Sequence, residues 1–262
     1  MYDILVLNPG STSTKAAVYR DERSLMARSV VHTNADLAPY PALNDQLDYR
    51  VGMVRSWLAL EGYDLSGLSA VVGRGGIIPN IVSGGYLVDE ALADCLLHHT
   101  VFDHASNLGG LMAREFARPL EVPAYIYDAV TSDELLPEAR VTGFKEVTRT
   151  SFCHVLNARA TSHKYAQAMG RRYEDMNLVV AHLGGGISVS AHSHGRIIDS
   201  VSDDAGPFSP DRGGSLNLLY VLDMCYSGKY TKAEMTKKLR GEGGMSALLG
   251  THDCQEVERR IA

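Results

Sequence analysis

The alternation of apolar and polar residues predicts strands and helices throughout the first half of the chain. Short apolar runs bounded by turn residues indicate strands, and apolar residues that recur every three or four positions indicate helices. The expected strands cover residues 2–7, 15–20, 25–33, 70–73 and 124–127. The expected helices cover residues 44–61, 89–97 and 106–116. The first half therefore alternates between strands and helices, as an α/β domain does.

A polar segment at residues 131–150 lacks clear periodicity, and we place a domain boundary near its end. The two predicted lobes are residues 1–150 and 151–262. The second lobe is expected to contain a helix and then three strands, with a short terminal helix after a glycine turn. These elements cover residues 152–170, 178–183, 187–192, 196–200 and 254–261. A hairpin followed by a third strand thus occurs in both halves, which favours duplication over the alternative that an α/β protein has two such hairpins by chance. As a duplicate, the second copy is too short to be complete.

Composition narrows the class of protein. The chain has 262 residues, 45% of them hydrophobic, which suits two domains with real cores. The net charge of −6 and the dispersed basic residues give no footprint for nucleic acid. No apolar run approaches the roughly 18 residues that cross a bilayer, and the N-terminus has no signal-peptide pattern. The 4 cysteines form no CxxC pair, which favours reduced thiols and a cytoplasmic protein.

Two glycine-containing turns between apolar runs are candidates for anion binding. The first carries small hydroxyl residues and a lysine, and the second is a run of glycines after a histidine. Such turns offer N–H groups, hydroxyls and a cation to phosphate, although a polar turn that satisfies its own backbone is the alternative. The candidate residues are Asn8, Ser11, Thr12, Ser13, Lys15, His182, Gly184, Gly185 and Gly186.

Two arginines stand beside paired glycines at distant positions in the sequence. Arg74 lies in residues 72–76 and Arg212 in residues 209–215. Glycine lets the backbone approach a ligand closely, and arginine binds carboxylate or phosphate through two parallel hydrogen bonds. We expect the two arginines to close on one anion from opposite sides. A surface salt bridge for Arg74 and two unrelated loops are the alternatives.

Other polar side chains stand where strands end or helices begin. Asp128 ends a buried strand, where an acid binds a metal or hydroxyl group or serves as a helix N-cap. His104 and Asn107 stand at the start of a predicted helix. His154 lies in an apolar stretch and His182 ends a buried strand. A single histidine in such a place is more often packed than catalytic, so the sequence leaves these roles open.

Together these elements resemble the acetate and butyrate kinase family of the actin–hexokinase–Hsp70 superfamily. Residues 8–15 look like its N-terminal signature, and residues 181–186 look like its second phosphate loop. Residues 73–76, 103–109 and 206–214 look like the butyrate branch. Members of the family are longer, and the segment that holds their adenosine-binding loop has no counterpart in this chain.

The resemblance implies an α/β fold of two duplicated ribonuclease-H-like (actin-like ATPase) lobes, with mixed sheets flanked by helices. The second lobe is truncated before the adenosine-binding loop. The implied reaction is transfer of the γ-phosphoryl group of ATP to butyrate or a similar short-chain fatty acid, which gives butyryl phosphate and ADP. Mg²⁺ is the implied cofactor, and a homodimer or higher homo-oligomer is the implied assembly.

The resemblance also assigns roles to residues. The implied phosphate-holding set is Asn8, Ser11, Thr12, Ser13, Lys15, His182, Gly184, Gly185 and Gly186. The implied contacts to carboxylate and migrating phosphoryl group are Arg74, Arg212, His104 and Asn107. Asp128 orients Mg²⁺ through water or fixes an arginine. Either His154 or His182 donates to the transition state. Without a gap the corresponding histidine falls on Arg159, but residues 152–157 resemble the start of a helix in the butyrate branch, which favours His154.

Alternatives to butyrate phosphorylation stay open at this point. Isobutyrate or another branched acid, propionate and acetate are rival substrates, because the sequence does not identify the apolar residues that set pocket size. A non-catalytic relative that binds nucleotide and a protein partner is a rival from another class, as is an inactive fragment. The two arginine motifs speak against a pure nucleotide binder, which needs no carboxylate clamp.

Overall fold

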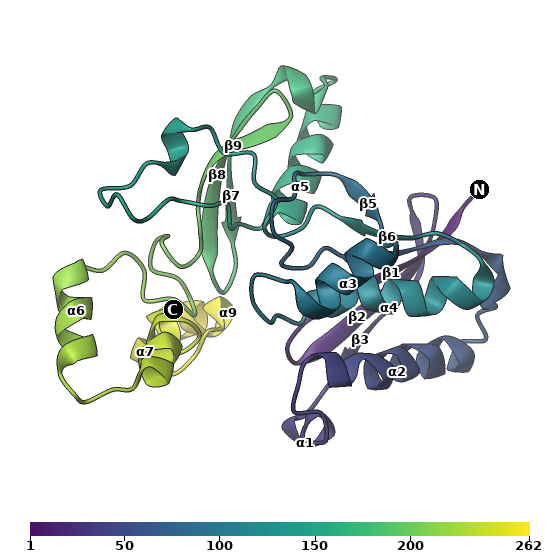
Figure 1. Cartoon of the computed structure of the whole chain (residues 1–262), viewed down its shortest axis with the longest axis horizontal. Coiled ribbons are helices and arrows are strands. Elements are labelled where there is room, and N and C mark those ends of the chain that lie inside the picture. The colour runs from purple at the N-terminus through teal and green to yellow at the C-terminus, as the bar shows by residue number, and fades with distance from the viewer. The chain divides into compact units, whose positions relative to one another are not determined.

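The computed structural model describes all residues from 1 to 262, which form two compact units (Figure 1). The first unit is Met1–Ser132 and the second is Asp133–Ala262. The division falls before residue 150 because the polar segment packs on the second unit. Its Arg149 Nη2 lies 2.8 Å from Asp199 Oδ1, and its Leu136 amide donates to the Ile198 carbonyl at 3.0 Å.

The first unit is built on a six-stranded mixed sheet. Its strands are β1 (Asp3–Pro9), β2 (Ser13–Arg20), β3 (Arg23–Val31), β4 (Leu68–Arg74), β5 (Gly85–Leu87) and β6 (Ala124–Tyr127). Their order in the sheet is β3-β2-β1-β4-β6-β5. Strands β1 to β3 form an antiparallel meander, β4 runs parallel to β1, and β6 runs parallel to β4. The carboxyl ends of β1, β4 and β6 therefore meet at one edge of the sheet.

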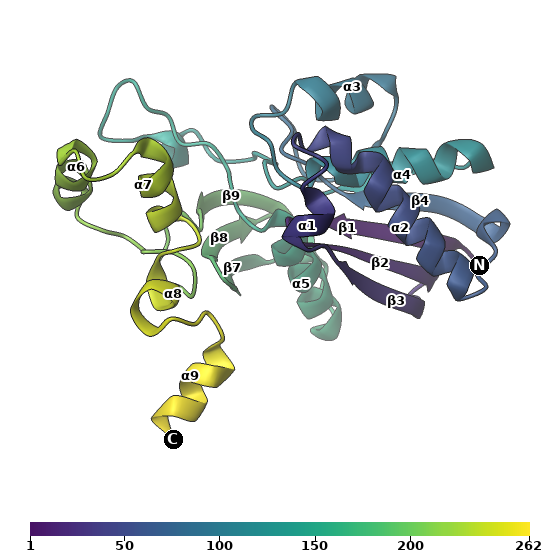
Figure 2. The same cartoon turned by 90° about the horizontal axis from the view of Figure 1, so that it is seen from below.

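Helices cover one face of this sheet and form the core of the unit (Figure 2). They are α1 (Asn34–Leu37), α2 (Leu47–Leu60), α3 (Glu90–His98) and α4 (Asn107–Ala117). Leu5 and Leu7 on β1 point into this layer because side chains alternate along a strand. They are fully buried with Val54 and Leu58 of α2 and Met112 of α4. Burying each such side chain stabilises the unit by about 2 kcal/mol, which holds the sheet and the helices together.

The second unit repeats the meander of the first. Its strands are β7 (Asn177–Leu183), β8 (Ile187–Ser193) and β9 (Arg196–Val201). They are antiparallel in the order β7-β8-β9, as β1, β2 and β3 are. The predicted repeat of a hairpin with a third strand is thus confirmed. Unlike β1, which has β4 beside it, β7 has no neighbour on its other edge.

The core of the second unit is small. Its helices are α5 (Val155–Ala168), α6 (Leu218–Tyr226), α7 (Lys232–Leu239), α8 (Gly244–Leu249) and α9 (Cys254–Ile261). One buried apolar cluster joins Cys153, Val155 and Ile197. Val179 and Leu183 on the open strand β7 are 78% and 77% exposed. Large apolar side chains on an unpaired strand mark a face that a complete lobe would cover.

Most predicted elements have counterparts within a few residues, while β5, α1, α6, α7 and α8 were not predicted. The β8–β9 turn places His194 and Gly195 at φ of 48° and 76°. Positive φ at both central residues is the geometry that joins antiparallel strands tightly. All four cysteines are free. No helix is both long and apolar enough to span a bilayer.

Candidate active site

The β1–β2 hairpin presents a group of polar side chains on one surface. Asn8 pairs with Lys15 across the hairpin, so the two side chains share one face of the sheet. A hollow of about 350 Å³ on this face is lined by both residues. Ser11 and Thr12 at the tip are exposed, and Ser13 is half-buried. The hairpin therefore offers an amide, a cation and hydroxyl groups in one place.

Arg74 lies next to this hairpin. The parallel pairing of Gly73 on β4 with Leu7 on β1 carries Arg74 to the level of Asn8. Arg74 Nη1 lies 3.5 Å from Asn8 Oδ1. The guanidinium is half-buried and forms no ion pair, and its burial lowers the pKa of Arg74 below its ordinary value. A partly desolvated cation without a carboxylate partner is stabilised by an anionic ligand.

Two glycines allow α4 to approach β4 closely. A Cβ on Gly73 would lie 2.0 Å from the Gly109 carbonyl oxygen. A Cβ on Gly109 would lie 2.4 Å from the Arg74 carbonyl oxygen. Backbone atoms cannot swing aside as a side chain does, so both positions require glycine. This close contact fixes the position of the Arg74 backbone at the end of β4 relative to α4.

His104 and Asn107 lie at the start of α4. Asn107 is 1% exposed, and its Oδ1 accepts a hydrogen bond from the Ile77 amide at 2.8 Å. Its Nδ2 donates to the Phe102 carbonyl at 3.1 Å, so the side chain fixes the loop that follows β4. His104 is exposed, and its Nδ1 lies 2.8 Å from Ser106 Oγ. Contact of His104 or Asn107 with a substrate stays a prediction.

Asp128 follows β6 with a left-handed backbone, at φ 44°. It is 2% exposed, and its Oδ1 accepts a hydrogen bond from the Gly84 amide at 2.9 Å. Such a conformation costs a non-glycine residue about 1 to 3 kcal/mol, and Asp adopts it more readily than most residues. No group of three or more metal-ligating side chains gathers in the structure. Mg²⁺ typically keeps several waters and takes one or two carboxylates beside substrate phosphates, so a single carboxylate here fits it.

The second unit brings its two candidate histidines together. The rings of His154 and His182 stack with centroids 3.7 Å apart and planes 7° apart. Ser188 Oγ lies 2.8 Å from His154 Nδ1, and Asn157 Nδ2 lies 2.7 Å from His182 Nδ1. Because the Asn157 amide donates to Nδ1, a neutral His182 carries its proton on Nε2. Both imidazoles therefore stand at the base of the glycine tip, and the choice between them stays open.

Arg212 is ion-paired, in contrast to Arg74. Its Nη2 lies 2.9 Å from Asp203 Oδ2, and its Nε lies 3.5 Å from Asp204 Oδ1. Asp204 is shared with Arg240. To bind an anion, Arg212 must share or exchange these carboxylates. Convergence of Arg74 and Arg212 on one ligand stays a prediction.

Carboxylates and a serine pack against the glycine tip of the β7–β8 hairpin. A Cβ on Gly185 would lie 2.4 Å from Asp211 Oδ2, and one on Gly186 would lie 2.5 Å from Asp203 Oδ2. Ser209 Oγ and the Asp211 amide donate to the Gly185 carbonyl at 2.7 and 2.8 Å. The segment that carries the second arginine motif thus meets the second glycine turn within one unit.

Comparison with known proteins identifies relatives along the whole chain. A probable butyrate kinase from Listeria monocytogenes is 44% identical over 262 residues, which cover 99% of this chain and 74% of that protein. Butyrate kinase 1 from Clostridium acetobutylicum is 41% identical over 259 residues, 98% of this chain and 73% of that protein. The sequence profile of the acetokinase family matches residues 145–262. The chain belongs to the acetokinase family.

Solved structures support the fold of this acetokinase-family chain. Porphyromonas gingivalis acetate kinase superposes with a TM-score of 0.77 at 17% identity, over 100% of this chain and 73% of that one. A propionate kinase from Francisella tularensis gives 0.72 at 18% identity, with the same coverage of both chains. At such identities the likeness concerns the fold alone. The predicted α/β, actin-like ATPase fold with an incomplete second lobe is confirmed.

Sequence reasoning about this acetokinase-family chain missed Arg50. It lies on α2, is fully buried, and contacts the backbone of the β1–β2 hairpin. A signal was present, because Arg50 shares the apolar stripe of its helix with Val54 and Trp57 at spacings of four and seven. A charged residue on such a stripe requires a buried partner.

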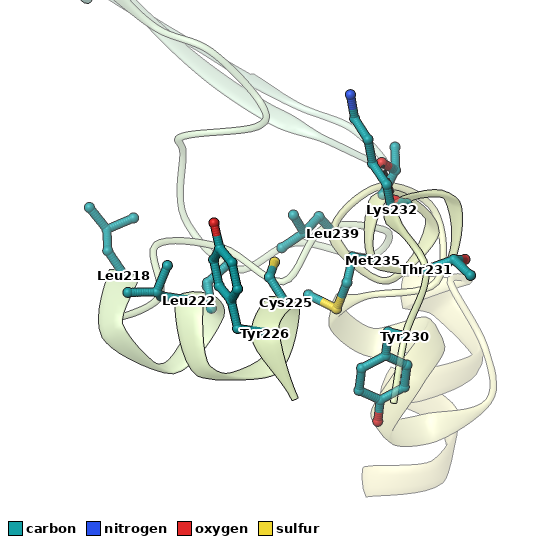
Figure 3. A pocket seen from close by; sticks show the side chains of 11 residues that line it. Leu218, Leu222, Cys225, Tyr226, Tyr230, Thr231, Lys232, Met235 and Leu239 are labelled. Atoms are coloured by element: carbon teal, nitrogen blue, oxygen red, sulfur yellow. Dashed lines mark hydrogen bonds between the residues drawn. The ribbon is translucent and has the colours of Figure 1, made fainter. Parts of the chain in front are cut away.

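A separate apolar hollow lies between α6 and α7 (Figure 3). It measures about 540 Å³ and is lined by side chains that include Leu222, Cys225 and Met235. Lys232 is its one charged lining residue. None of the predicted site residues lines this hollow, so it is separate from the candidate active site.

Proposed function

We propose that this chain is a carboxylate kinase that transfers the γ-phosphoryl group of ATP to butyrate or a similarly short fatty acid, reversibly. The products are butyryl phosphate and ADP. The half-buried, unpaired Arg74 beside Asn8 at the hairpin supports this proposal most directly, within a chain 44% identical to a probable butyrate kinase. We further propose that it acts in the cytoplasm as a homodimer or higher homo-oligomer.

The first unit supplies groups suited to phosphoryl transfer. Charge spreads over three equatorial oxygens in the transition state, so cations and N–H donors provide most of the catalysis. Arg74 grips the carboxylate and the migrating group. Asn8 Oδ1 faces Arg74, which leaves Asn8 Nδ2 to donate to a phosphoryl oxygen. Lys15 and the hydroxyls of the hairpin tip hold the remaining phosphates.

The second unit supplies the other half of the proposed site. In this proposal Arg212 also binds the migrating phosphoryl group, and either His154 or His182 donates to it. The tip at Gly184–186 approaches the phosphates without side chains in the way. The proposed reaction requires a site that excludes water, because water competes with the fatty acid as acceptor. A carboxylate acceptor is already ionised at pH 7, so no general base is required.

Asp128 is the residue proposed to hold Mg²⁺, through water. When bound, Mg²⁺ would neutralise charge on the phosphates of ATP. The Gly84 amide donates to Asp128 Oδ1, which helps to orient the carboxylate at the end of β6.

The test compares Arg74→Ala with Arg55→Ala. Arg55 is an exposed arginine of the same unit whose Nη2 donates to the Glu115 carbonyl. Acyl phosphate formed from ATP and a panel of acids is trapped with hydroxylamine, after equilibrium binding of ATP has been measured. We expect Arg74→Ala to lower turnover ~10²- to 10³-fold and Arg55→Ala to leave it unchanged.

Butyrate is expected to be the best acid of a panel that also contains isobutyrate, propionate and acetate. Near-normal turnover of Arg74→Ala would remove Arg74 from the mechanism. Binding of ATP without product from any acid would instead favour a nucleotide-binding relative without kinase activity.

A further inference from the structure

Arg50 is a buried cation without a carboxylate partner. Its side chain is 0% exposed, and it forms no ion pair. Nη1 donates to the Gly10 carbonyl at 2.9 Å and to the Ser13 carbonyl at 3.4 Å, while Nη2 donates to the Ser11 carbonyl at 3.3 Å. Gln46 Oε1 accepts from Nε at 3.1 Å and from Nη2 at 2.9 Å. One guanidinium thus gathers three carbonyls of the hairpin tip.

This arrangement decides where the amides of the tip point. In a planar trans peptide, the C=O of one residue and the N–H of the next point in opposite directions. Drawing in the carbonyls of Gly10 and Ser11 therefore turns the N–H groups of Ser11 and Thr12 away from Arg50. Neither N–H donates within the structure, and both residues are exposed. Two outward amides on neighbouring residues form an anion-binding concavity.

A second contact holds the other side of the tip. The backbone amide of His32 donates to the Thr12 carbonyl at 2.9 Å. Nε2 of the His32 imidazole lies 2.8 Å from Thr14 Oγ1. Thr14 Oγ1 also accepts from Arg50 Nη1 at 2.9 Å. Burial lowers the pKa of His32, and the Arg50 charge lowers it further, so this imidazole is neutral at pH 7. Arg50 therefore supplies the charge behind the tip, unbalanced by any acid.

Stability alone does not account for an arginine at this position. Burying an unpaired charge costs several kcal/mol, and an apolar side chain of similar volume commonly serves a core as well or better. The neighbours of Arg50 on the same stripe, Val51 and Val54, are ordinary core residues. The cost of burying Arg50 is offset at the hairpin, because Arg50 orders the hairpin carbonyls and makes the tip electropositive.

We propose that Arg50 is a positioning residue that holds the β1–β2 tip with its amides outward, ready for the phosphate oxygens of the nucleotide or acyl phosphate. This inference rests on the proposed function for the identity of the anion. It extends that function to a residue that touches no ligand and acts through the backbone of residues 10–13.

The test uses Arg50→Met, which keeps the volume without the charge, and Arg50→Lys, which keeps the charge. Arg20→Met is the matched control, because Arg20 pairs with Asp3 at the far end of the same two strands. Fluorescence of the sole tryptophan, Trp57 on α2, verifies that each variant is folded. Inorganic tripolyphosphate is titrated into each protein while the Ser11 and Thr12 amide signals are followed by NMR.

We expect Arg50→Met to bind tripolyphosphate at least ~10-fold more weakly, because the tip must then be ordered on binding. The KM for ATP should rise in the same proportion with a smaller change in kcat. The Gly10 and His32 amides, whose hydrogen bonds close the tip, should exchange faster with solvent. Arg50→Lys should recover part of the affinity, and Arg20→Met should match the wild type.

Two results separate the inference from the proposed function. If folded Arg50→Met keeps the wild-type KM, tripolyphosphate affinity and amide exchange, then Arg50 is a structural residue and the inference is overturned. If the wild type forms no acyl phosphate from any acid, yet Arg50→Met weakens tripolyphosphate binding and speeds exchange, the proposed kinase fails while the positioning role of Arg50 stands.

Discussion

The two glycine-bearing hairpins share a backbone design and differ in the charge behind their tips. Both open an antiparallel three-stranded meander, β1–β2–β3 in one unit and β7–β8–β9 in the other. The first tip rests on the guanidinium of Arg50, with no acid in contact. The second tip rests on the carboxylates of Asp203 and Asp211. Duplication of a backbone motif has therefore not duplicated its electrostatics.

The difference indicates a division of labour between the hairpins. An electropositive tip with outward amides suits bare phosphate oxygens. A tip backed by carboxylates attracts cations, and in this structure Asp203 holds Arg212. We infer that the first hairpin binds phosphate by its backbone, and that the second acts mainly by placing Arg212 and the histidine pair.

The same substitution at each tip gives the sharpest test of this comparison. A Cβ on Gly10 would lie 3.4 Å from the Ser13 carbonyl oxygen and 3.9 Å from Ser13 Oγ, which are ordinary contact distances. A Cβ on Gly186 would lie 2.7 Å from Asp203 Cβ, so Asp203 must move and take Arg212 with it.

We expect Gly186→Ala to lower turnover ~100-fold, as a misplacement of about 1 Å can do. Gly10→Ala should change it by no more than about twofold. Steady-state kinetics of both variants with ATP and butyrate provides the measurement. Equal losses of turnover in the two variants would show that the residues packed against each tip do not make the two hairpins functionally different.

Asp203→Asn tests whether a carboxylate at the second tip orients Arg212. The side chains of Asp203 and Arg212 are 11% and 21% exposed, so removal of one charge leaves the other partly buried. We expect the free energy of unfolding of the second unit to fall by about 2 kcal/mol, below the range for fully buried pairs, and turnover to fall as well.

Asp133→Asn is the control, because Asp133 pairs with Arg140 in the same unit and has no assigned role in the site. It should lower stability without lowering turnover. The stability of both variants is measured by urea denaturation, with the unfolding of β7 to β9 monitored by hydrogen exchange of their peptides, and turnover is measured separately. Unchanged turnover in Asp203→Asn would mean that the ion pair does not orient Arg212.

The smallest expected effect is a pH dependence carried by His192 on β8. Burial lowers the pKa of His192 to about 4, with Arg159 adding to the shift, and Tyr173 Oη lies 2.6 Å from its Nδ1. The unfolded chain has a pKa near 6.5 for this group and so binds the proton first. Stability is therefore complete above pH 6.5 and is lost as the pH falls towards 4.

Between pH 7 and 5.5 the second unit should lose about 1 kcal/mol of stability through His192. His192→Gln should abolish this component of the slope, and hydrogen exchange of β7 to β9 at the two pH values measures it. Trp57 fluorescence follows the first unit independently, where His32 also has a lowered pKa. A slope for the second unit that is the same in wild type and His192→Gln would contradict this assignment.

Local pattern predicted much of the fold and some of the site. The meanders, α2, α4 and the positions of Asn8 and Arg74 follow from strand and helix periodicity and from glycine turns. The boundary between units was placed later than the structure has it, because hydrogen bonds from Arg149 and Leu136 to β9 are invisible to periodicity. Helices α6 and α7 were not predicted, although start signals were present: Asn217 caps α6, and Thr231 and Glu234 form the capping box that begins α7.

The sequence by itself determined the alternation of strands and helices, the repeat, and which residue types stand at each turn, since these depend on neighbours a few positions apart. Only the tertiary structure decided which charge faces each turn. Arg50 reaches Gly10 across 40 positions and Asp203 meets Gly186 across 17, through packing of helix and loop on the sheet. Electrostatic free energy depends on distance in space and on burial, neither of which is encoded in local spacing.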